Sequence, residues 1–448
     1  MAQSSAKTQE TLGLKELVAM GVGGMVGGGI FSVLGLAVAQ AGHAAPIAFA
    51  IGGVIALITG ISYTKLGLAF HSDGGSFTYL EHAFTHQNIA GMGGWLLLTG
   101  YIGTMALYAY TFGVYGSAMI GTMFLTPTLN QHILASLILV LFLGINLRGV
   151  KSAGESEVVI VIIKVIILAI FAGVGFFSIK SGYLFPIMNR GGVQVLMGAA
   201  LIFVAYEGFE LIPNAINEMD NPRRDLGRAI VYSIVITTII YIFVSLVAVG
   251  NLLPSEISKY KEYALAVAAK PALGQAGFLL IGLGALLSTA SAINATMFGS
   301  ARLGLAMAQD KHLPQSFSHR ERTADIPWVS MVVIAALVFV FVNIANLTII
   351  SSFASSTFLL IFSAINLSAL KIHRKAGISV WIATTGFTLT IVSWLVLIGY
   401  LWQTDITSLI WLAGFYVAII VSELLFSERR LIFNKTHHKM KRGKNETE

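Results

Sequence analysis

Long apolar stretches recur along this chain, and they limit what it can fold into more than any other feature. A transmembrane helix needs about 20 consecutive apolar residues. Only 11% of the 448 residues are charged, whereas soluble domains carry about 25%. We therefore expect an all-α polytopic membrane protein with 12 transmembrane helices. The predicted spans are 14–39, 45–70, 89–123, 132–148, 154–180, 192–218, 226–250, 275–306, 328–345, 348–370, 379–402 and 406–426.

The basic residues predict how these spans are oriented. With the N-terminus in the cytoplasm, 22 of the 28 Lys and Arg residues fall on the cytoplasmic side and 5 on the outer side. Lys164 is the remaining one. Such an excess follows the positive-inside rule and places both termini in the cytoplasm. The net charge of +7 then reflects membrane topology and attraction to anionic lipid, and no nucleic acid partner is expected.

Lys164 lies within the most apolar of the spans. It is the only charged residue between Glu157 and Lys180. A lysine at the centre of a bilayer costs about 2.5–3.5 kcal/mol on insertion scales, so it usually faces the protein interior. Burial favours its neutral form, and Lys164 is therefore a candidate for gaining and losing a proton. The alternative is a side chain that extends toward the end of the helix near Glu157, about 10 Å away.

The first span contains a run of glycines from Gly21 to Gly29, with six glycines in nine positions. Each glycine costs a helix about 1 kcal/mol relative to alanine. We expect an interruption near Met25–Gly29 and a helix that restarts at about Ile30. Free carbonyls before the gap would suit an ammonium group, and free amides after it a carboxylate. The alternative is a packing face made by glycines four residues apart.

The sixth span carries a second candidate interruption, with Glu207, Gly208, Glu210 and Pro213 at its middle. Proline removes a backbone donor, and glycine weakens the helix. Interruptions at the start of two five-span halves are typical of inverted-repeat transporters. For Pro213 alone, a simple kink is the alternative.

Several motifs make the chain similar to a known family. It resembles the amino acid–polyamine–organocation (APC) superfamily, and within it most closely the ApcT-type proton-coupled amino acid transporters. The motifs are 24–31 (GMVGGGIF), 205–210 (AYEGFE), 218–230 (EMDNPRRDLGRAI), 288–296 (STASAINAT), 62–67 (SYTKLG) and 264–271 (ALAVAAKP).

The resemblance implies a LeuT-type 5+5 inverted repeat with two peripheral helices. Repeat one would cover about 14–180, repeat two about 192–370, and the peripheral helices about 379–426. These form one transporter domain, 12–426. It lies between a cytoplasmic N-terminal segment, 1–11, and a basic cytoplasmic tail, 427–448.

The resemblance also implies a substrate site where the first and sixth spans meet. Amides of the first span would bind the substrate carboxylate, and carbonyls of both spans its ammonium, with Phe203 as a hydrophobic gate. Glu207 departs from many relatives, and it is interpreted as a second proton carrier, a gate, a selector for cationic substrates or a structural acid. The implied substrate-binding residues are Met25, Val26, Gly27, Gly28, Gly29, Ile30, Phe203, Val204, Tyr206 and Glu207.

In ApcT-type relatives a lysine of the fifth span takes the place of a sodium ion, and Lys164 matches that position. It would bond carbonyls near Val22 and Gly23, and the hydroxyls of Ser288 and Ser291 would complete the site. The proton would then be the coupling ion, and neither sodium nor a cofactor is expected. The chain has no cysteine and no HExxH-type pair, so no metal site is expected.

These expectations lead to one preferred function and several alternatives. We expect a secondary active transporter of the cell membrane that imports amino acids by proton symport with alternating access, and we expect its substrates to be neutral amino acids. An amino acid exchanger without obligatory net proton flux is the alternative. An enzyme is not expected, because the spans hold no catalytic arrangement of residues. A channel is not expected either, because the sequence shows no ring of charged residues that could form a selectivity filter. The oligomeric state does not follow from the sequence.

Overall fold

The computed structural model describes residues 12–71, 75–84, 86–121, 126–148, 154–319 and 326–426. Within these ranges the chain is almost entirely helical, and its only β-bridge joins Leu12 to Met219. The predicted N-terminal segment 1–11 and basic tail 427–448 lie outside the described residues.

Each of the twelve predicted spans corresponds to a helix or, in one case, to a broken series of helices. At 17 residues, α11 is the shortest of the unbroken ones. The unbroken spans are α1 (Leu14–Ala41), α2 (Ala45–Phe70), α4 (Gln87–Ile120), α5 (Pro127–Leu147), α6 (Gly154–Phe176), α8 (Pro222–Asn251), α10 (Ala264–Gln309), α11 (Trp328–Ile344), α12 (Leu347–Lys371), α14 (Val380–Thr404) and α15 (Ile406–Phe426). The broken span comprises α7 (Gly192–Leu201), η3 (Phe203–Tyr206) and η4 (Phe209–Glu218).

Short helices connect some of these spans. They are α3 (Gly75–Ala83), α9 (Pro254–Lys259) and α13 (His373–Ala376). Within α10, Gly274 has φ +62° and interrupts the helical geometry, so the predicted span at 275–306 begins where the second part of α10 begins.

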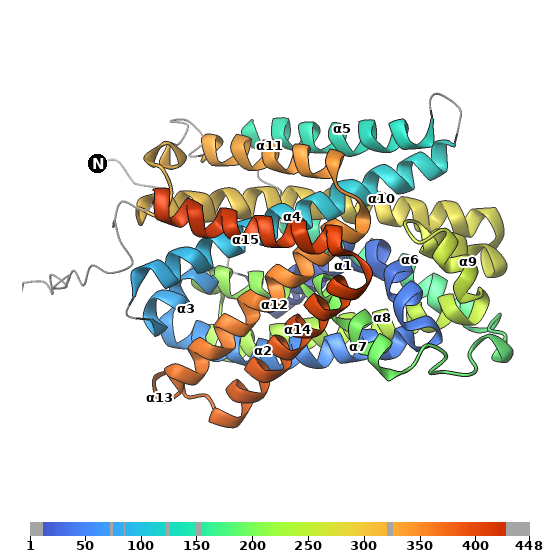
Figure 1. The fold of residues 1–448 in the computed structure, drawn as a ribbon, viewed down its shortest axis with the longest axis horizontal. Coiled ribbons are helices and arrows are strands. Elements are labelled where there is room, and N and C mark those ends of the chain that lie inside the picture. Colours follow the sequence, from blue (N-terminus) through green and yellow to red (C-terminus); the bar gives the residue numbers. More distant parts are fainter. Residues whose placement is uncertain are drawn as a thin grey trace, which may run out of the picture.

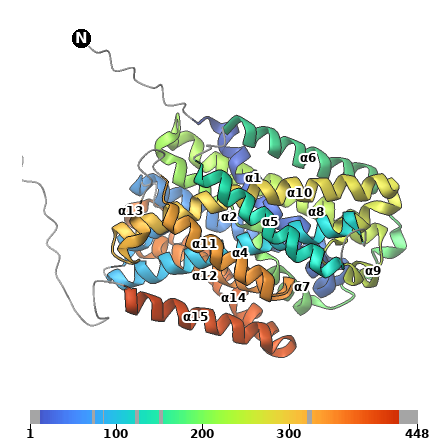
Figure 2. The same cartoon turned by 90° about the horizontal axis from the view of Figure 1, so that it is seen from above.

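Helix α1 passes through the middle of the bundle (Figure 1). All but one of residues 21–38 are buried, because α1 is apolar on every side and other helices surround it. At the edge of the bundle, α5 and α11 lie side by side (Figures 1 and 2). Their outward side chains are apolar and exposed, among them Leu137 and Val140. This surface suits lipid better than water, and the fold is that of an all-α polytopic membrane protein.

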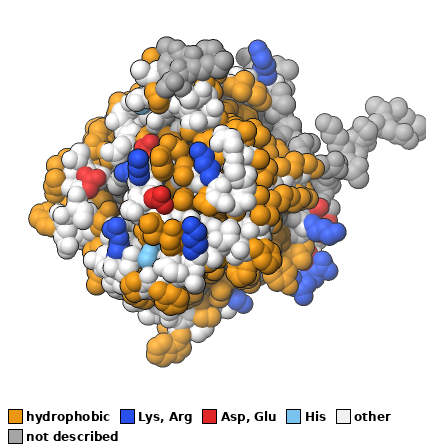
Figure 3. Space-filling view, turned by 90° about the vertical axis from the view of Figure 1, so that its right-hand side faces the viewer, with side chains coloured by type: hydrophobic (Ala, Val, Ile, Leu, Met, Phe, Trp, Pro, Cys, Tyr) orange, Lys and Arg blue, Asp and Glu red, His pale blue; other side chains and the backbone are white. Residues whose placement is uncertain are grey.

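The loops that follow α6 and α9 lie at the same end of the bundle, near the end of α8. Lys180, after α6, donates its backbone N–H to the carbonyl of Gly250 at the end of α8, at 2.9 Å. The carbonyl of Lys261, after α9, lies against Gly35 of α1. Figure 3 looks onto the end that carries α9, where charged side chains stand on the end face and hydrophobic ones cover much of the rim.

The predicted interruption of the sixth span is confirmed. The axis bends by 55° between α7 and the 3-10 segments that follow. Gly208, between η3 and η4, has φ +126°, which residues with a side chain rarely adopt. Pro213 lies within η4.

The predicted interruption of the first span is wrong. α1 continues from Leu14 to Ala41 with no residue of non-helical geometry between them. Its glycines serve the alternative that the sequence left open, a packing face. A Cβ on Gly24 would lie 2.9 Å from Gly208 Cα, and one on Gly27 would lie 2.7 Å from Ala292 Cβ. These close contacts require residues that have no side chain, but they do not require an unwound backbone. α1 therefore remains helical.

Candidate functional site

The interruption of the sixth span frees backbone groups, and side chains of α12 bond to the first of them. The carbonyl of Leu201 accepts from Ser355 Oγ at 2.7 Å and from Ser351 Oγ at 3.2 Å. The amide of Val204 donates to Ser355 Oγ at 3.0 Å. Unsatisfied backbone groups cost several kcal/mol in a bilayer, so these serines stabilise the interruption.

The turn after η3 is closed by the chain itself. Gly208 N donates to Glu210 Oε2 at 2.7 Å. A Cβ on Gly208 would lie only 2.7 Å from the backbone of Gly24 and Met25. The turn therefore rests directly on the glycine face of α1, and both its positive φ and this close approach require glycine.

Tyr241 of α8 joins the first and sixth spans. Its hydroxyl lies 2.6 Å from the carbonyl oxygen of Met25 and 2.9 Å from that of Ala205, and it donates toward both. A Cβ on Gly29 would lie 2.5 Å from this hydroxyl. The two segments predicted to bind substrate thus meet, and one buried hydroxyl bonds to each of them.

Tyr108 of α4 lies over the predicted substrate site. Its ring packs against Gly28, where a Cβ would overlap it, and it also contacts Gly27, where a Cβ would lie 3.9 Å from a ring carbon. Its hydroxyl donates to Glu207 Oε2 at 2.7 Å. Only 2% of Glu207 is exposed. In this conformation the tyrosine ring covers the face of α1 on which a substrate was expected.

Glu210 is the second buried acid of the interruption, and 1% of it is exposed. Its Oε1 atom is buried without a hydrogen-bond partner. Within the described ranges, neither Glu207 nor Glu210 forms an ion pair. A buried charge without a partner is costly, so a proton or another cation would be favourable at this position.

The other predicted residues of the sixth span are also buried at this junction. The ring of Phe203 lies edge-on to that of Phe362 of α12, with centroids 5.7 Å apart. Tyr206 donates its hydroxyl to the carbonyl of Phe49 in α2, at 2.5 Å. On α1, Ile30 is buried as well. The structure therefore brings the predicted substrate-binding residues of both spans together in a closed arrangement.

Lys164 is buried, with 1% of its surface exposed, so its side chain does not extend to the surface. One turn before it, Val161 packs against Gly23 of α1, and one turn after it, Ile167 packs against Gly284 of α10. Lys164 thus lies on a stretch of α6 that contacts both α1 and α10.

Of the groups predicted to surround the lysine, Val22, Gly23 and Ser288 are buried, and Ser291 is partly exposed. Ser288 Oγ donates to the carbonyl of Val26 at 2.5 Å, and Ser291 Oγ to the carbonyl of Ser288 at 3.0 Å. Each hydroxyl already donates its hydrogen to a carbonyl, but its oxygen can still accept a hydrogen bond from an ammonium group. Their role beside Lys164 stays a prediction.

Sequence reasoning missed Tyr241 and Ser355, the residues that bond to the freed backbone groups. Serine and tyrosine are common in transmembrane helices, and their partners lie 36 to 216 residues away in the chain. The one available signal was a buried hydroxyl in an otherwise apolar span. In lipid such a group seeks a hydrogen-bond partner.

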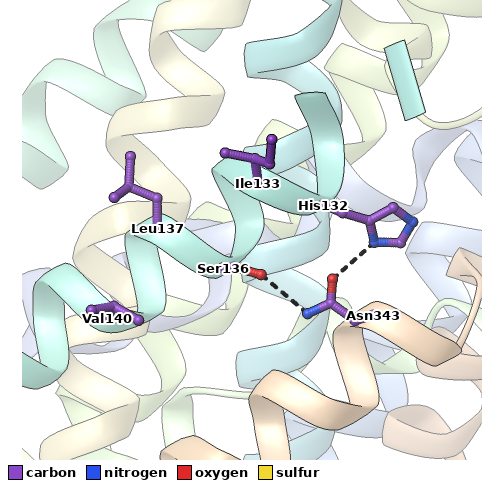
Figure 4. Close-up of a pocket in the computed structure, with 6 residues that line it drawn as sticks. All are labelled: His132, Ile133, Ser136, Leu137, Val140 and Asn343. Atoms are coloured by element: carbon purple, nitrogen blue, oxygen red, sulfur yellow. Dashed lines mark hydrogen bonds between the residues drawn. The ribbon is translucent and has the colours of Figure 1, made fainter. Parts of the chain in front are cut away.

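A shallow hollow of about 440 Å³ lies away from this site, between α5 and α11 (Figure 4). His132 Nδ1 is 3.0 Å from Asn343 Oδ1, and Asn343 Nδ2 donates to Ser136 Oγ at 3.1 Å. Among the residues that the structure describes, no group of three or more His, Asp or Glu side chains is placed to hold a metal ion.

Spanning helices packed around an interrupted helix, with buried ionisable side chains at their centre, define a polytopic membrane transporter. The family model for amino acid permeases matches residues 12–424. The chain belongs to the amino acid permease family, within the APC superfamily, and it is a transporter and not an enzyme.

Three relatives illustrate the similarity. An uncharacterised protein of Methanocaldococcus jannaschii is 33% identical over 416 residues, which cover 93% of this chain and 95% of that protein. The inner membrane transport protein YbaT of Escherichia coli is 29% identical over 431 residues, covering 94% and 97%. The serine/threonine exchanger SteT of Bacillus subtilis is 29% identical over 349 residues, covering 75% and 77%.

Proposed function

We propose that this transporter imports amino acids by proton symport with alternating access, in the manner of the ApcT-type transporters that it resembles. The observation that carries the proposal is the burial of Lys164 on the face of α6 between α1 and α10. Packing alone does not require an ionisable group there. Because burying an ammonium group in the membrane costs free energy, such a group usually has a function.

Protonation of Lys164 would change what it can bond. As an ammonium it has three donors for carbonyls of α1 near Val22 and Gly23, and for the oxygens of Ser288 and Ser291. As a neutral amine it binds those acceptors more weakly. Since the same helix carries residues Met25–Ile30 of the substrate site, the charge of the lysine and the position of the site are linked through α1.

The substrate is proposed to enter between the glycine face of α1 and the segment Phe203–Glu207. Tyr108 covers that face in the closed conformation, and it has to move aside for a substrate to bind. Glu207 already accepts from Tyr108, and Glu210 from Gly208. Because Glu207, the acid of the predicted substrate site, is already engaged by Tyr108, neutral amino acids fit the proposal better than cationic ones.

Uptake into liposomes tests this function. Purified protein is first screened against all amino acids by thermal shift, and the hits are then offered to empty proteoliposomes in sodium-free buffer. We expect accumulation with an acidic exterior and its loss when a protonophore collapses the gradient. Uptake that needs sodium, or that ignores the pH gradient, contradicts proton symport.

Exchange is the second candidate function, because a relative of this chain is named as a serine/threonine exchanger. An exchanger would load vesicles only when they already contain amino acid. Comparison of preloaded with empty proteoliposomes therefore separates the two functions.

The proposal includes cell-membrane localisation with both termini in the cytoplasm, which the distribution of basic residues supports. Single cysteines placed at Lys7 and at Lys259 test it, since the chain has no cysteine of its own. A membrane-impermeant thiol reagent applied to intact cells should label the second and not the first. Labelling of the first alone contradicts the orientation.

A further inference from the structure

Tyr241 lies at the junction of three elements. It is completely buried in α8, and its ring packs edge-on against Phe49 and Tyr206, with centroids 5.4 and 5.5 Å away. Its hydroxyl donates toward the carbonyls of Met25 in α1 and Ala205 in the sixth span. One proton is shared between two acceptors that lie 180 residues apart in the chain.

The two carbonyls differ in their other partners. Met25 lies within a continuous helix, so Tyr241 bonds to its second lone pair. Ala205 lies at the interruption, where the next available amide, Gly208 N, donates to Glu210 instead. The hydroxyl of Tyr241 therefore replaces a helical donor for Ala205 and at the same time fixes Ala205 to α1.

The surroundings leave little room for this pair of bonds to shift. A Cβ on Gly29 would lie 2.5 Å from the Tyr241 hydroxyl and 3.0 Å from both Cα and O of Ala205. Glycine at 29 thus lets the three groups approach one another. The donor, both acceptors and the space between them form one local arrangement.

We propose that Tyr241 is a positioning residue of the transporter, which holds α1 and the interrupted sixth span in register so that they form one preorganised substrate site. The inference rests on the proposed function, because it assigns the site to substrate. It needs no contact between Tyr241 and the substrate. Preorganised sites bind more tightly because less ordering is left to be done on binding.

The test compares two variants that each lose one hydrogen-bonded tyrosine hydroxyl. Tyr241→Phe keeps the ring and removes the bonds to both carbonyls. Tyr416→Phe is the matched control, since its hydroxyl bonds to Ser356 of α12 and lies near Trp394 of α14, in the peripheral part of the bundle. Proteoliposome uptake gives KM and Vmax, and hydrogen–deuterium exchange of the substrate-free protein reports on peptides covering 25–31 and 203–211.

We expect Tyr241→Phe to raise KM about two- to tenfold, the range for one buried hydrogen bond, with a smaller change in Vmax. Exchange should rise in both peptides, and Tyr416→Phe should change neither KM nor these peptides. A fall in Vmax alone, or faster exchange in only one peptide, would overturn the positioning role.

The two readouts separate this inference from the proposed function. If the wild-type protein transports no amino acid, the proposed function fails, and the exchange result still decides whether Tyr241 joins the two spans. If Tyr241→Phe does not fold, Gly29→Ala is the second variant, because it keeps the hydroxyl and crowds it against Ala205. Unchanged exchange in the 203–211 peptide of Gly29→Ala would also overturn the proposal.

Discussion

Helix α1 and the sixth span lie against each other at the centre of the bundle, yet only one of them is interrupted. They touch where Gly24 meets Gly208 and where Gly29 meets Ala205. Both contain glycines at mid-span. α1 nevertheless remains a continuous helix, whereas the sixth span bends by 55°.

The difference lies in the partners that each backbone finds. In the sixth span, Ser355 bonds to the carbonyl of Leu201 and the amide of Val204. Tyr241 donates to the carbonyl of Ala205, and Glu210 accepts from the amide of Gly208. In lipid an interruption persists only where such partners exist.

The side chains around α1 offer only additional donors to its carbonyls. The carbonyls of Met25 and Val26 accept from the hydroxyls of Tyr241 and Ser288. The carbonyl of Gly28 accepts from the hydroxyl of Ser32, in α1 itself. A carbonyl has two lone pairs, so it can accept such a bond and keep its helical one. Glycine content permits an interruption, and the supply of partners determines whether one forms.

The largest effect is expected at the turn of the sixth span. Gly208→Ala places a side chain at a residue with positive φ and puts its Cβ 2.7 Å from the backbone of α1. The substitution should lower the free energy of unfolding by about 3 kcal/mol or more. Thermal unfolding in detergent measures it. Gly173→Ala in α6 is the control, because a Cβ there meets nothing within 4 Å, and it should be neutral or stabilise slightly. Equal stability of the two variants contradicts the close contact between the spans.

An intermediate effect is expected on α1. Gly28→Ala pushes a Cβ into the ring of Tyr108 and should cost about 1–3 kcal/mol, although alanine is the better helix former. In the background Tyr108→Ala the same substitution should cost little, giving a coupling energy of about 1–3 kcal/mol. The same cost in both backgrounds would mean that Gly28 serves the backbone and not the packing.

The smallest effect is expected where one hydroxyl supports the interruption. Ser355→Ala leaves Val204 N without its acceptor and should lower stability by about 1 kcal/mol. Ser368→Ala in the same helix removes a hydroxyl that donates to the carbonyl of Ala364, one turn earlier, and should cost less. If the two serines prove equivalent in thermal unfolding, α12 does not stabilise the break.

Most of the fold followed from the sequence, because lipid makes each span a local property. The predicted limits 45–70 and 406–426 coincide with those of α2 and α15. The interruption of the sixth span was also predictable, since Gly208 and Pro213 weaken a helix wherever they occur.

The state of α1 was not predictable from its own residues. Whether Gly24, Gly27 and Gly28 unwind or pack depends on Gly208, Ala292 and Tyr108, which lie far away in the chain. The same holds for Tyr241, whose two acceptors are known only once the helices are placed. The burial of Lys164 could be predicted because a charged side chain in an apolar span usually faces the protein interior and not the lipid.

Gradient-driven uptake by the Lys164→Ala variant tests the central claim most directly. Lys270→Ala is the control, since Lys270 is exposed and lies over the ring of Phe278. Both variants should still bind substrate in a thermal-shift assay. Proton symport through Lys164 predicts that only Lys164→Ala loses the accumulation driven by an acidic exterior. Accumulation by Lys164→Ala equal to that of the wild type and the control would contradict the claim.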